Sequence, residues 1–517
     1  MFRKGLLISL LICVPLSLFA GGNRAQTSSS TAGGPMTISV TRRGNVRTVN
    51  KEDMFAAFIL QRFNVVLDIT DINANDYLTR MNLMFAADEA TDVSLAHRPV
   101  FNLNEWTESG YLRGFTQAEV QQKLPNYIAH YASDAWPVVW QNIVHSSGKT
   151  YYLPGRRATN INMAWMYRED IFTRYGVTFP ETLDGLFNTL MTLKERTGMI
   201  PMIETNNDVI WCFTGLLQPF GIPELAPSEI SYVNPKTGEF FAYAFTTNDF
   251  RRHTAYIAKL YANDLIWKEF ATATVEQKNR MMSMGNRYVF WGYPQNVDTE
   301  YNELSRVENS SASWNWAKVF PAENPANGFF FKREPYFAAD GIGFYAYADE
   351  AKIERFLQML NWFYSEEGSV FNTYGIEGVH YRRQGNNYVF MDHMSSPLSP
   401  AGDGLVNYGF IGLGPEHPNL NAYYRPYLVD LENTFFNRDN YYFFTKPVQV
   451  FTSDESRELA DLEVNLNQAR NEFYSRFIVG QLDVNNDRDW NNYLDTMRRM
   501  GLNRVIEIRT AAYNRSR

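Results

Sequence analysis

Cysteine is nearly absent from this chain. Only Cys13 and Cys212 occur among 517 residues. Cys13 lies in an apolar run that we expect to be removed, so Cys212 would remain alone and no intramolecular disulfide could form. Stability must then come from buried apolar surface, and a chain of this length can form two or more cores.

The sequence also lacks a block of Lys and Arg residues, and its formal net charge is −8. A moderately acidic protein without a basic cluster is a poor candidate for binding nucleic acid or an anionic membrane. Nucleic acid is therefore not among the partners that we expect.

Long apolar runs are missing beyond the first, which covers residues 5–19 and is short for a membrane span. Arg3 and Lys4 precede this run and small residues follow it, so we predict a signal peptide over residues 1–22 and a periplasmic or exported protein. Residues 18–21 resemble a bacterial lipoprotein signal. Gly22 stands where the lipid-bearing cysteine would be needed, so no lipid anchor is expected. Residues 23–35 are rich in Ser, Thr and Gly and predict a flexible tether.

Catalytic and metal-binding motifs are missing as well. The sequence contains no HExxH, GxSxG, P-loop or GxGxxG motif, and its seven histidines are scattered. Residues 483–487 begin like a calcium loop, but Arg488 stands where Gly is needed and Leu494 where Glu is needed. We therefore predict no catalytic residue, metal or cofactor. Paired carboxylates could still support glycoside hydrolysis, so a secreted carbohydrate-active enzyme remains an alternative.

The apolar pattern indicates alternating strands and helices. Helices are expected at 54–63 and 77–87, and strands at 65–69 and 92–96, which is typical of a mostly parallel sheet covered by helices. Ligands of such sheets bind beyond the carboxyl ends of the strands. Arg98 follows one of these ends.

Residues 151–198 predict a junction between two such units. A strand at 151–153 stops at Pro154-Gly155, a polar bridge follows, and residues 163–167 form a second apolar strand. Leucines then recur with helical spacing from Leu183 to Leu193, between Thr182 and Gly198 as start and stop signals.

Five blocks in order resemble the extracellular solute-binding proteins of family 1, the exported receptors of bacterial ABC importers, and most of all their LipO-like and alginate-binding branch. The blocks are residues 152–183, 259–266, 284–290, 360–381 and 477–515. Many relatives carry a calcium loop after the helix that ends near residue 197. Residues 194–203 read KERTGMIPMI and lack the paired acidic oxygens for it, so no calcium is expected there.

This resemblance implies an α/β, two-lobed periplasmic-binding-protein fold, in which each lobe is a mostly parallel sheet flanked by helices and the ligand lies in the cleft between the lobes. Lobe one would comprise residues 36–155 with about 341–367, and lobe two residues 156–340 with about 368–517. The implied function is a monomeric receptor that binds a sugar or oligosaccharide and delivers it to an ABC permease. A sensory or adhesive binding protein without a transporter is a further alternative.

Aromatic residues are plentiful, with 11 Trp, 31 Tyr and 37 Phe, and rings that stack on sugars beside amides that hold hydroxyls are a common ligand-site design. Each candidate has a structural alternative: a turn cap for the amides, a surface ion pair for the arginine, and the core for the rings. Trp314 and Trp316 lie in an aromatic, turn-rich stretch where we expect exposure. The predicted ligand contacts are Arg98, Asn160, Asn162, Asn206, Asn207, Trp211, Trp291, Tyr293, Trp314 and Trp316.

Overall fold

In the computed structural model the described residues are 34–43, 54–73, 76–97, 103–131, 135–145, 147–156, 163–204, 209–223, 230–294, 297–317, 321–332, 337–391, 417, 429–430, 433, 441–444 and 447–516. The predicted signal peptide at 1–22, Gly22 included, and the tether up to residue 33 lie outside them. None of the described helices is long and apolar enough to cross a membrane.

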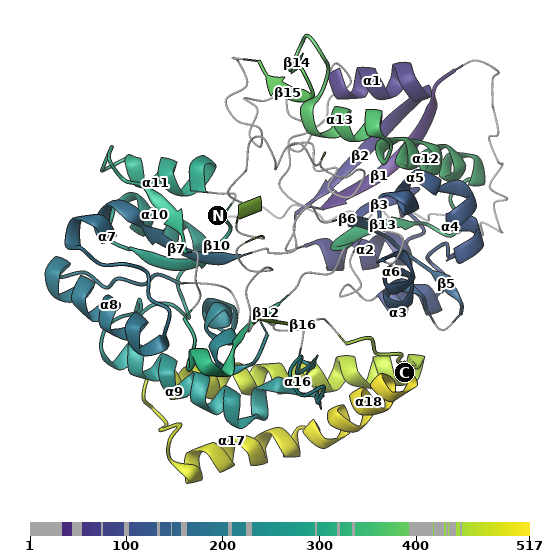
Figure 1. Cartoon of the computed structure of the whole chain (residues 1–517). Helices are drawn as coiled ribbons and strands as arrows, with labels where there is room; N and C mark the ends of the chain where they lie inside the picture. The colour runs from purple at the N-terminus through teal and green to yellow at the C-terminus, as the bar shows by residue number, and fades with distance from the viewer. Residues whose placement is uncertain are drawn as a thin grey trace, which may run out of the picture.

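The chain forms two α/β lobes, each with a sheet flanked by helices, as the sequence predicted (Figure 1). The first lobe contains a five-stranded sheet in the order β2-β1-β3-β13-β6. Its strands are β1 (Met36–Arg43), β2 (Val65–Ile72), β3 (Val93–His97), β6 (Leu153–Arg156) and β13 (Phe337–Phe344), with a small pair β4 (Phe115–Thr116) and β5 (Lys149–Thr150) beside them. Its helices are α1 (Met54–Phe63), α2 (Tyr77–Ala86), α3 (Leu103–Glu108), α4 (Gln117–Lys123), α5 (Pro125–Ala129), α6 (Ala135–Ile143), α12 (Glu350–Phe363) and α13 (Glu366–Tyr374).

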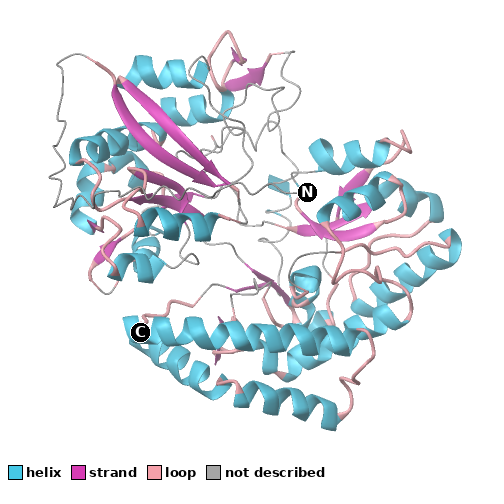
Figure 2. Ribbon diagram, turned by 180° about the vertical axis from the view of Figure 1, so that it is seen from behind, coloured by secondary structure: helices cyan, strands magenta, loops and turns pink. Residues whose placement is uncertain are grey.

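The second lobe contains a three-stranded sheet in the order β10-β7-β11 and most of the remaining helices. Its strands are β7 (Ala164–Arg168), β10 (Val289–Gly292) and β11 (Trp314–Trp316), with a pair β8 (Tyr232–Val233) and β9 (Phe240–Phe241). Its helices are α7 (Glu169–Tyr175), α8 (Leu183–Thr197), α9 (Asn248–Ala262), α10 (Val275–Ser283), α11 (Asn302–Arg306), α16 (Ser453–Ile478), α17 (Asp487–Arg499) and α18 (Leu502–Arg515), together with the 3₁₀ helices η1 (Trp211–Leu216) and η2 (Gln218–Phe220) and the π-helical turn η5 (Val297–Tyr301). The last three α-helices lie along the base of this lobe (Figure 2).

Two further strand pairs complete the described chain. β12 (Phe329–Lys332) pairs in parallel with β16 (Tyr441–Phe444), and β14 (Tyr381–Gln384) forms a hairpin with β15 (Asn387–Phe390). Of these strands, β14, β15 and β16 lie in the stretch 381–447, where the sequence indicates mainly loops.

Strand directions follow the parallel expectation in the first lobe and depart from it in the second. β1 is parallel to β2 and β3, and only β13 runs against its neighbours β3 and β6. β7 is instead antiparallel to both β10 and β11. β11 comes from the stretch that we expected to be loop, and its partner β7 lies far away in the sequence, so local patterns gave no sign of the pairing.

The junction predicted around residues 151–198 is the place where the chain first passes from one sheet to the other. β6 belongs to the first sheet and β7 to the second, and only residues 157–163 separate them. The prediction that Pro154-Gly155 stops the strand is wrong, because β6 runs through both residues. Their place in β6, the outermost strand of the sheet, explains this tolerance of proline.

The helix predicted after this junction is confirmed as α8. Thr182 caps it by accepting the Gly185 N–H at 3.0 Å, and Gly198 ends it in the left-handed conformation with a φ of 70°. Its leucine face is fully buried in the core of the second lobe.

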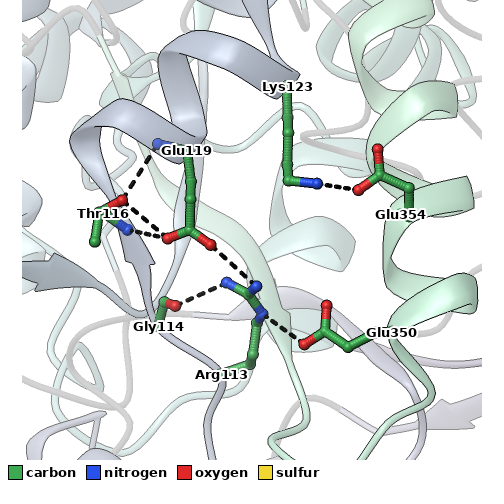
Figure 3. A network of polar contacts seen from close by, with 7 residues as sticks. All are labelled: Arg113, Gly114, Thr116, Glu119, Lys123, Glu350 and Glu354. Carbon is green, nitrogen blue, oxygen red and sulfur yellow. Dashed lines mark hydrogen bonds and ion pairs between the residues drawn. The ribbon is translucent and has the colours of Figure 1, made fainter.

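Segments distant in sequence complete each core. Apolar side chains of the first core come from residues 38–153 and 342–371, and those of the second from 164–317 and 444–508. A polar network holds the returning helix α12 against α4 (Figure 3). In it Arg113 bonds both Glu119, at 3.1 Å, and Glu350, at 3.2 Å, while Lys123 pairs with Glu354.

Candidate functional site

Two of the three passages of the chain between the lobes begin or end at the edge of the first sheet where its parallel strands end. β3 ends at His97, which is level with Gly341, and the pairing of Arg156 with Phe337 extends further in the same direction. The end of β6 and the start of β13 therefore lie beside each other at the carboxyl ends of β1, β2 and β3. In open α/β sheets this is the edge at which ligands bind.

In the second sheet, the start of β7 and the end of β10 lie at one edge, and β7 is the strand that follows β6 in the chain. The first residue of β7, Ala164, pairs with the last of β10, Gly292. Met202 bridges Val289 in parallel, so the chain that continues to Glu204 reaches the same edge as β10. Figure 1 shows these strand ends directed toward the middle of the molecule, as are those of the first sheet.

An ion pair lies at the edge of the first sheet where β1 and β2 end. The fully buried guanidinium of Arg42 donates from Nε to Asp71 Oδ1 at 2.7 Å and from Nη2 to Oδ2 at 2.9 Å. The two residues are directly paired in the parallel register of β1 and β2. Because the Asp71 side chain is 28% exposed, this bidentate pair presents a fixed carboxylate at the surface of the edge.

Glu204 is the corresponding charged group of the second lobe. It is 5% exposed, its Oε1 accepts the backbone N–H of Trp291, and its Oε2 lies 3.9 Å from Lys278 Nζ. Burial raises the pKa of the Glu204 carboxyl to about 7, although Lys278 and the Trp291 N–H both lower it. The group can therefore change its charge near neutral pH.

Trp291, one of the predicted ligand contacts, is 4% exposed, and its ring is packed in the core of the second lobe. A Cβ at Gly215 would lie 2.5 Å from its Cδ2, so the glycine backbone covers one face of the ring. The indole of Trp165 contacts it at 5.3 Å in an edge-to-face arrangement. In this conformation Trp291 is a core residue, which is the structural alternative given above for the aromatic candidates.

Trp314 and Trp316 are also buried, and the expectation that they are exposed is wrong. Both belong to β11 and to the apolar core of the second lobe. Trp314 Nε1 donates to Ser305 Oγ at 2.7 Å, and its ring lies 4.9 Å from that of Phe290. The alternation of Trp, Asn and Trp therefore buries the rings, while the Asn315 amide donates to Glu169 Oε1 at 2.9 Å.

Tyr293 and Trp211 remain as aromatic candidates with accessible surface. Tyr293 follows the end of β10 and is 38% exposed, and its N–H donates to the Tyr301 hydroxyl at 3.0 Å. Trp211 begins η1 and is partly buried. Five predicted contacts lie outside the described residues, namely Arg98, Asn160, Asn162, Asn206 and Asn207.

Sequence reasoning missed Arg42, Asp71 and Glu204. Each is a charged residue at the end of an apolar strand pattern, and that position was the available signal. The chemistry of the edge is that of a binding surface with carboxylate and phenol groups. Within the described ranges, no group of three or more His, Cys, Asp or Glu side chains is arranged to hold a metal ion.

Comparisons with known proteins agree with this architecture. A model of the family described as bacterial extracellular solute-binding protein matches residues 53–369. The melibiose/raffinose/stachyose-binding protein MelE of Bacillus subtilis is 24% identical over 188 residues, which is 36% of this chain and 40% of that protein. The match thus spans well under two thirds of MelE.

Solved structures share the fold over nearly the whole chain. The alginate-binding protein AlgQ2 superposes with a TM-score of 0.73 at 16% identity, covering 93% of this chain and 98% of AlgQ2. The substrate-binding protein FusA of S. pneumoniae, solved with kestose, gives 0.71 at 16% identity and covers 93% of this chain and 99% of FusA. With the family model matching more than half of its length, this chain belongs to the bacterial extracellular solute-binding proteins.

Proposed function

We propose that this protein is the exported receptor of an ABC importer, and that it binds an oligosaccharide between its lobes and delivers it to a membrane permease. Membership of the family supports a binding protein rather than an enzyme. The names of MelE, AlgQ2 and FusA point to sugars as the ligand class. The observation that supports the proposal is that β6 ends and β13 begins at the carboxyl end of the first sheet, while β7 begins beside the end of β10 in the second.

The mechanism follows from this arrangement. The lobes would rotate about the passage between β6 and β7, and a ligand that contacts both lobes would favour the closed state by its extra affinity for that state. No bond is made or broken. The closed form would then dock on the permease as a monomer.

The proposed contacts combine a ring with polar groups. Tyr293 would stack on a sugar face, with Trp211 beside it, and Asp71 would accept hydroxyl protons from the first lobe. Arg98, Asn160, Asn162, Asn206 and Asn207 remain proposed contacts from the sequence.

Calorimetric titration against a glycan panel tests the proposal. Melibiose, raffinose, stachyose, kestose and alginate oligosaccharides cover the ligand types named for MelE, FusA and AlgQ2. We expect micromolar or tighter binding of one of them, and Tyr293→Ala should weaken it at least tenfold. Tyr347→Ala is the matched control, because Tyr347 is 74% exposed beyond the other end of β13.

If none of the glycans in the panel binds, the carbohydrate assignment is refuted. Release of shorter products from a bound glycan would favour the carbohydrate-active enzyme. Tight binding without any uptake in cells that carry the neighbouring permease would favour the sensory or adhesive alternative.

A further inference from the structure

Two side chains fix the backbone that carries Tyr293. Glu204 accepts the N–H of Trp291, and the hydroxyl of Tyr301 accepts the N–H of Tyr293. Tyr301 is itself held, because its ring meets Phe290 edge-to-face at 4.8 Å. In addition to the pairing of β10 with β7, the segment from Trp291 to Tyr293 is thus held by one titratable carboxyl group and one buried phenol.

The groups that face Glu204 come from three elements. Lys278 of α10 lies 3.9 Å from Oε2, and its ammonium also sits over the Phe290 ring at 4.7 Å. Tyr301 of η5 interacts with Glu204 electrostatically, and β10 supplies the Trp291 N–H. A single ammonium beyond hydrogen-bonding distance does not fully compensate a carboxylate that is 5% exposed.

The geometry points to Glu204 as a positioning residue of the ligand site, whose protonation state sets the conformation of the Trp291–Tyr293 segment and, through it, the affinity for a glycan. The statement about the glycan rests on the proposed function. Glu204 touches the backbone and need not touch the ligand.

The sign of the effect follows from burial. Charge on Glu204 is disfavoured while the segment is closed, so ionisation favours its local opening. When a glycan binds and the lobes close, further water would be removed from around Glu204, and the pKa of its carboxyl would rise again. Affinity should therefore fall as the pH rises above about 7, tenfold for each pKa unit by which binding raises it.

Hydrogen exchange of the peptide covering residues 289–294 tests the positioning step without any ligand. We compare wild type with Glu204→Gln at pH 5.5 and at pH 8.5, because glutamine keeps the acceptor and cannot ionise. The quantity to compare is the exchange rate of the wild-type peptide divided by that of Glu204→Gln. This ratio should be up to about 30-fold higher at pH 8.5 than at pH 5.5. Glu239→Gln, in an exposed turn of the same lobe, should behave as wild type. An equal ratio at both pH values would overturn the proposal.

A second variant tests the electrostatic cause. Lys278→Met removes the ammonium that lowers the pKa of Glu204, so the pH at which exchange accelerates should move upward. A downward move, or none, would contradict the role of Glu204 as the titrating group.

Titration with raffinose, kestose and alginate oligosaccharides at the same two pH values tests the binding step. A glycan that binds wild type should bind more weakly at pH 8.5, and the pH dependence should disappear in Glu204→Gln. The same pH dependence in both proteins would refute the positioning role and leave the proposed function standing. Failure of all three glycans to bind would count against the proposed function, while hydrogen exchange would still decide whether Glu204 controls the segment.

Discussion

Substituting Glu204 by Gln should remove a pH dependence from the stability of the fold. Burial raises the pKa of this carboxyl from its ordinary value of 4.5 to about 7 in the folded chain. Between these two pH values the folded state holds a proton that the unfolded state has lost. The free energy of unfolding of the wild type must therefore decrease as the pH rises.

The magnitude follows from the same two values. Their difference corresponds to about 3.4 kcal/mol over the whole range, and about 2 kcal/mol of it falls between pH 5.5 and pH 8.5. Other carboxylates titrate in both proteins, so the quantity to compare is the difference between wild type and Glu204→Gln. Above pH 8 this difference should be constant.

Urea unfolding followed by tryptophan fluorescence at pH 5.5, 6.5, 7.5 and 8.5 measures it. The free energy of unfolding of Glu204→Gln minus that of wild type should increase by about 2 kcal/mol from pH 5.5 to pH 8.5. Glu239→Gln provides the control, since its exposed side chain should leave the wild-type curve unchanged. Parallel curves for wild type and Glu204→Gln would refute the reasoning.

Three substitutions test the packing of the two lobes. Gly215→Ala places a Cβ 2.5 Å from the Trp291 ring, so we expect a loss of about 1–3 kcal/mol in urea unfolding, and an unchanged midpoint would contradict the packed position of this indole. Asp71→Asn takes the carboxylate from the buried Arg42 guanidinium, so thermal melts should show a loss of about 1–3 kcal/mol; a variant as stable as wild type would show that the pair contributes nothing. Tyr127→Phe deletes a 2.7 Å hydrogen bond to a β6 carbonyl and should cost about 1 kcal/mol by the same melts, whereas a gain in stability would argue against that bond.

The architecture was predictable where local signals and family blocks agreed. Thr182, the leucine face and Gly198 define α8 within the sequence itself, and the structure has the helix at Leu183–Thr197. The two-lobed fold followed from the order of the five blocks, which a short strand pattern could not have provided alone.

The site was less predictable because burial depends on residues far apart in sequence. Nothing near Trp291 shows that Gly215 covers its ring, and nothing near Trp314 shows that β11 pairs with β7. The burial of Trp291, Trp314 and Trp316 therefore cannot be predicted from their positions at a strand end or in a turn-rich stretch. The raised pKa of Glu204 is unpredictable for the same reason, since it depends on burial and on Lys278 and Trp291, which are distant in sequence.

The position of β13 constrains when the protein can fold. β13 lies between β3 and β6, yet it is synthesised almost two hundred residues after β6. Until it arrives, the facing edges of β3 and β6 have no partner, and the core of the second lobe likewise waits for α16, α17 and α18. Neither lobe can therefore close its core from a nascent N-terminal portion, and such long-range closure makes folding slow. This order of assembly leaves both cores incomplete until nearly all of the chain has been made.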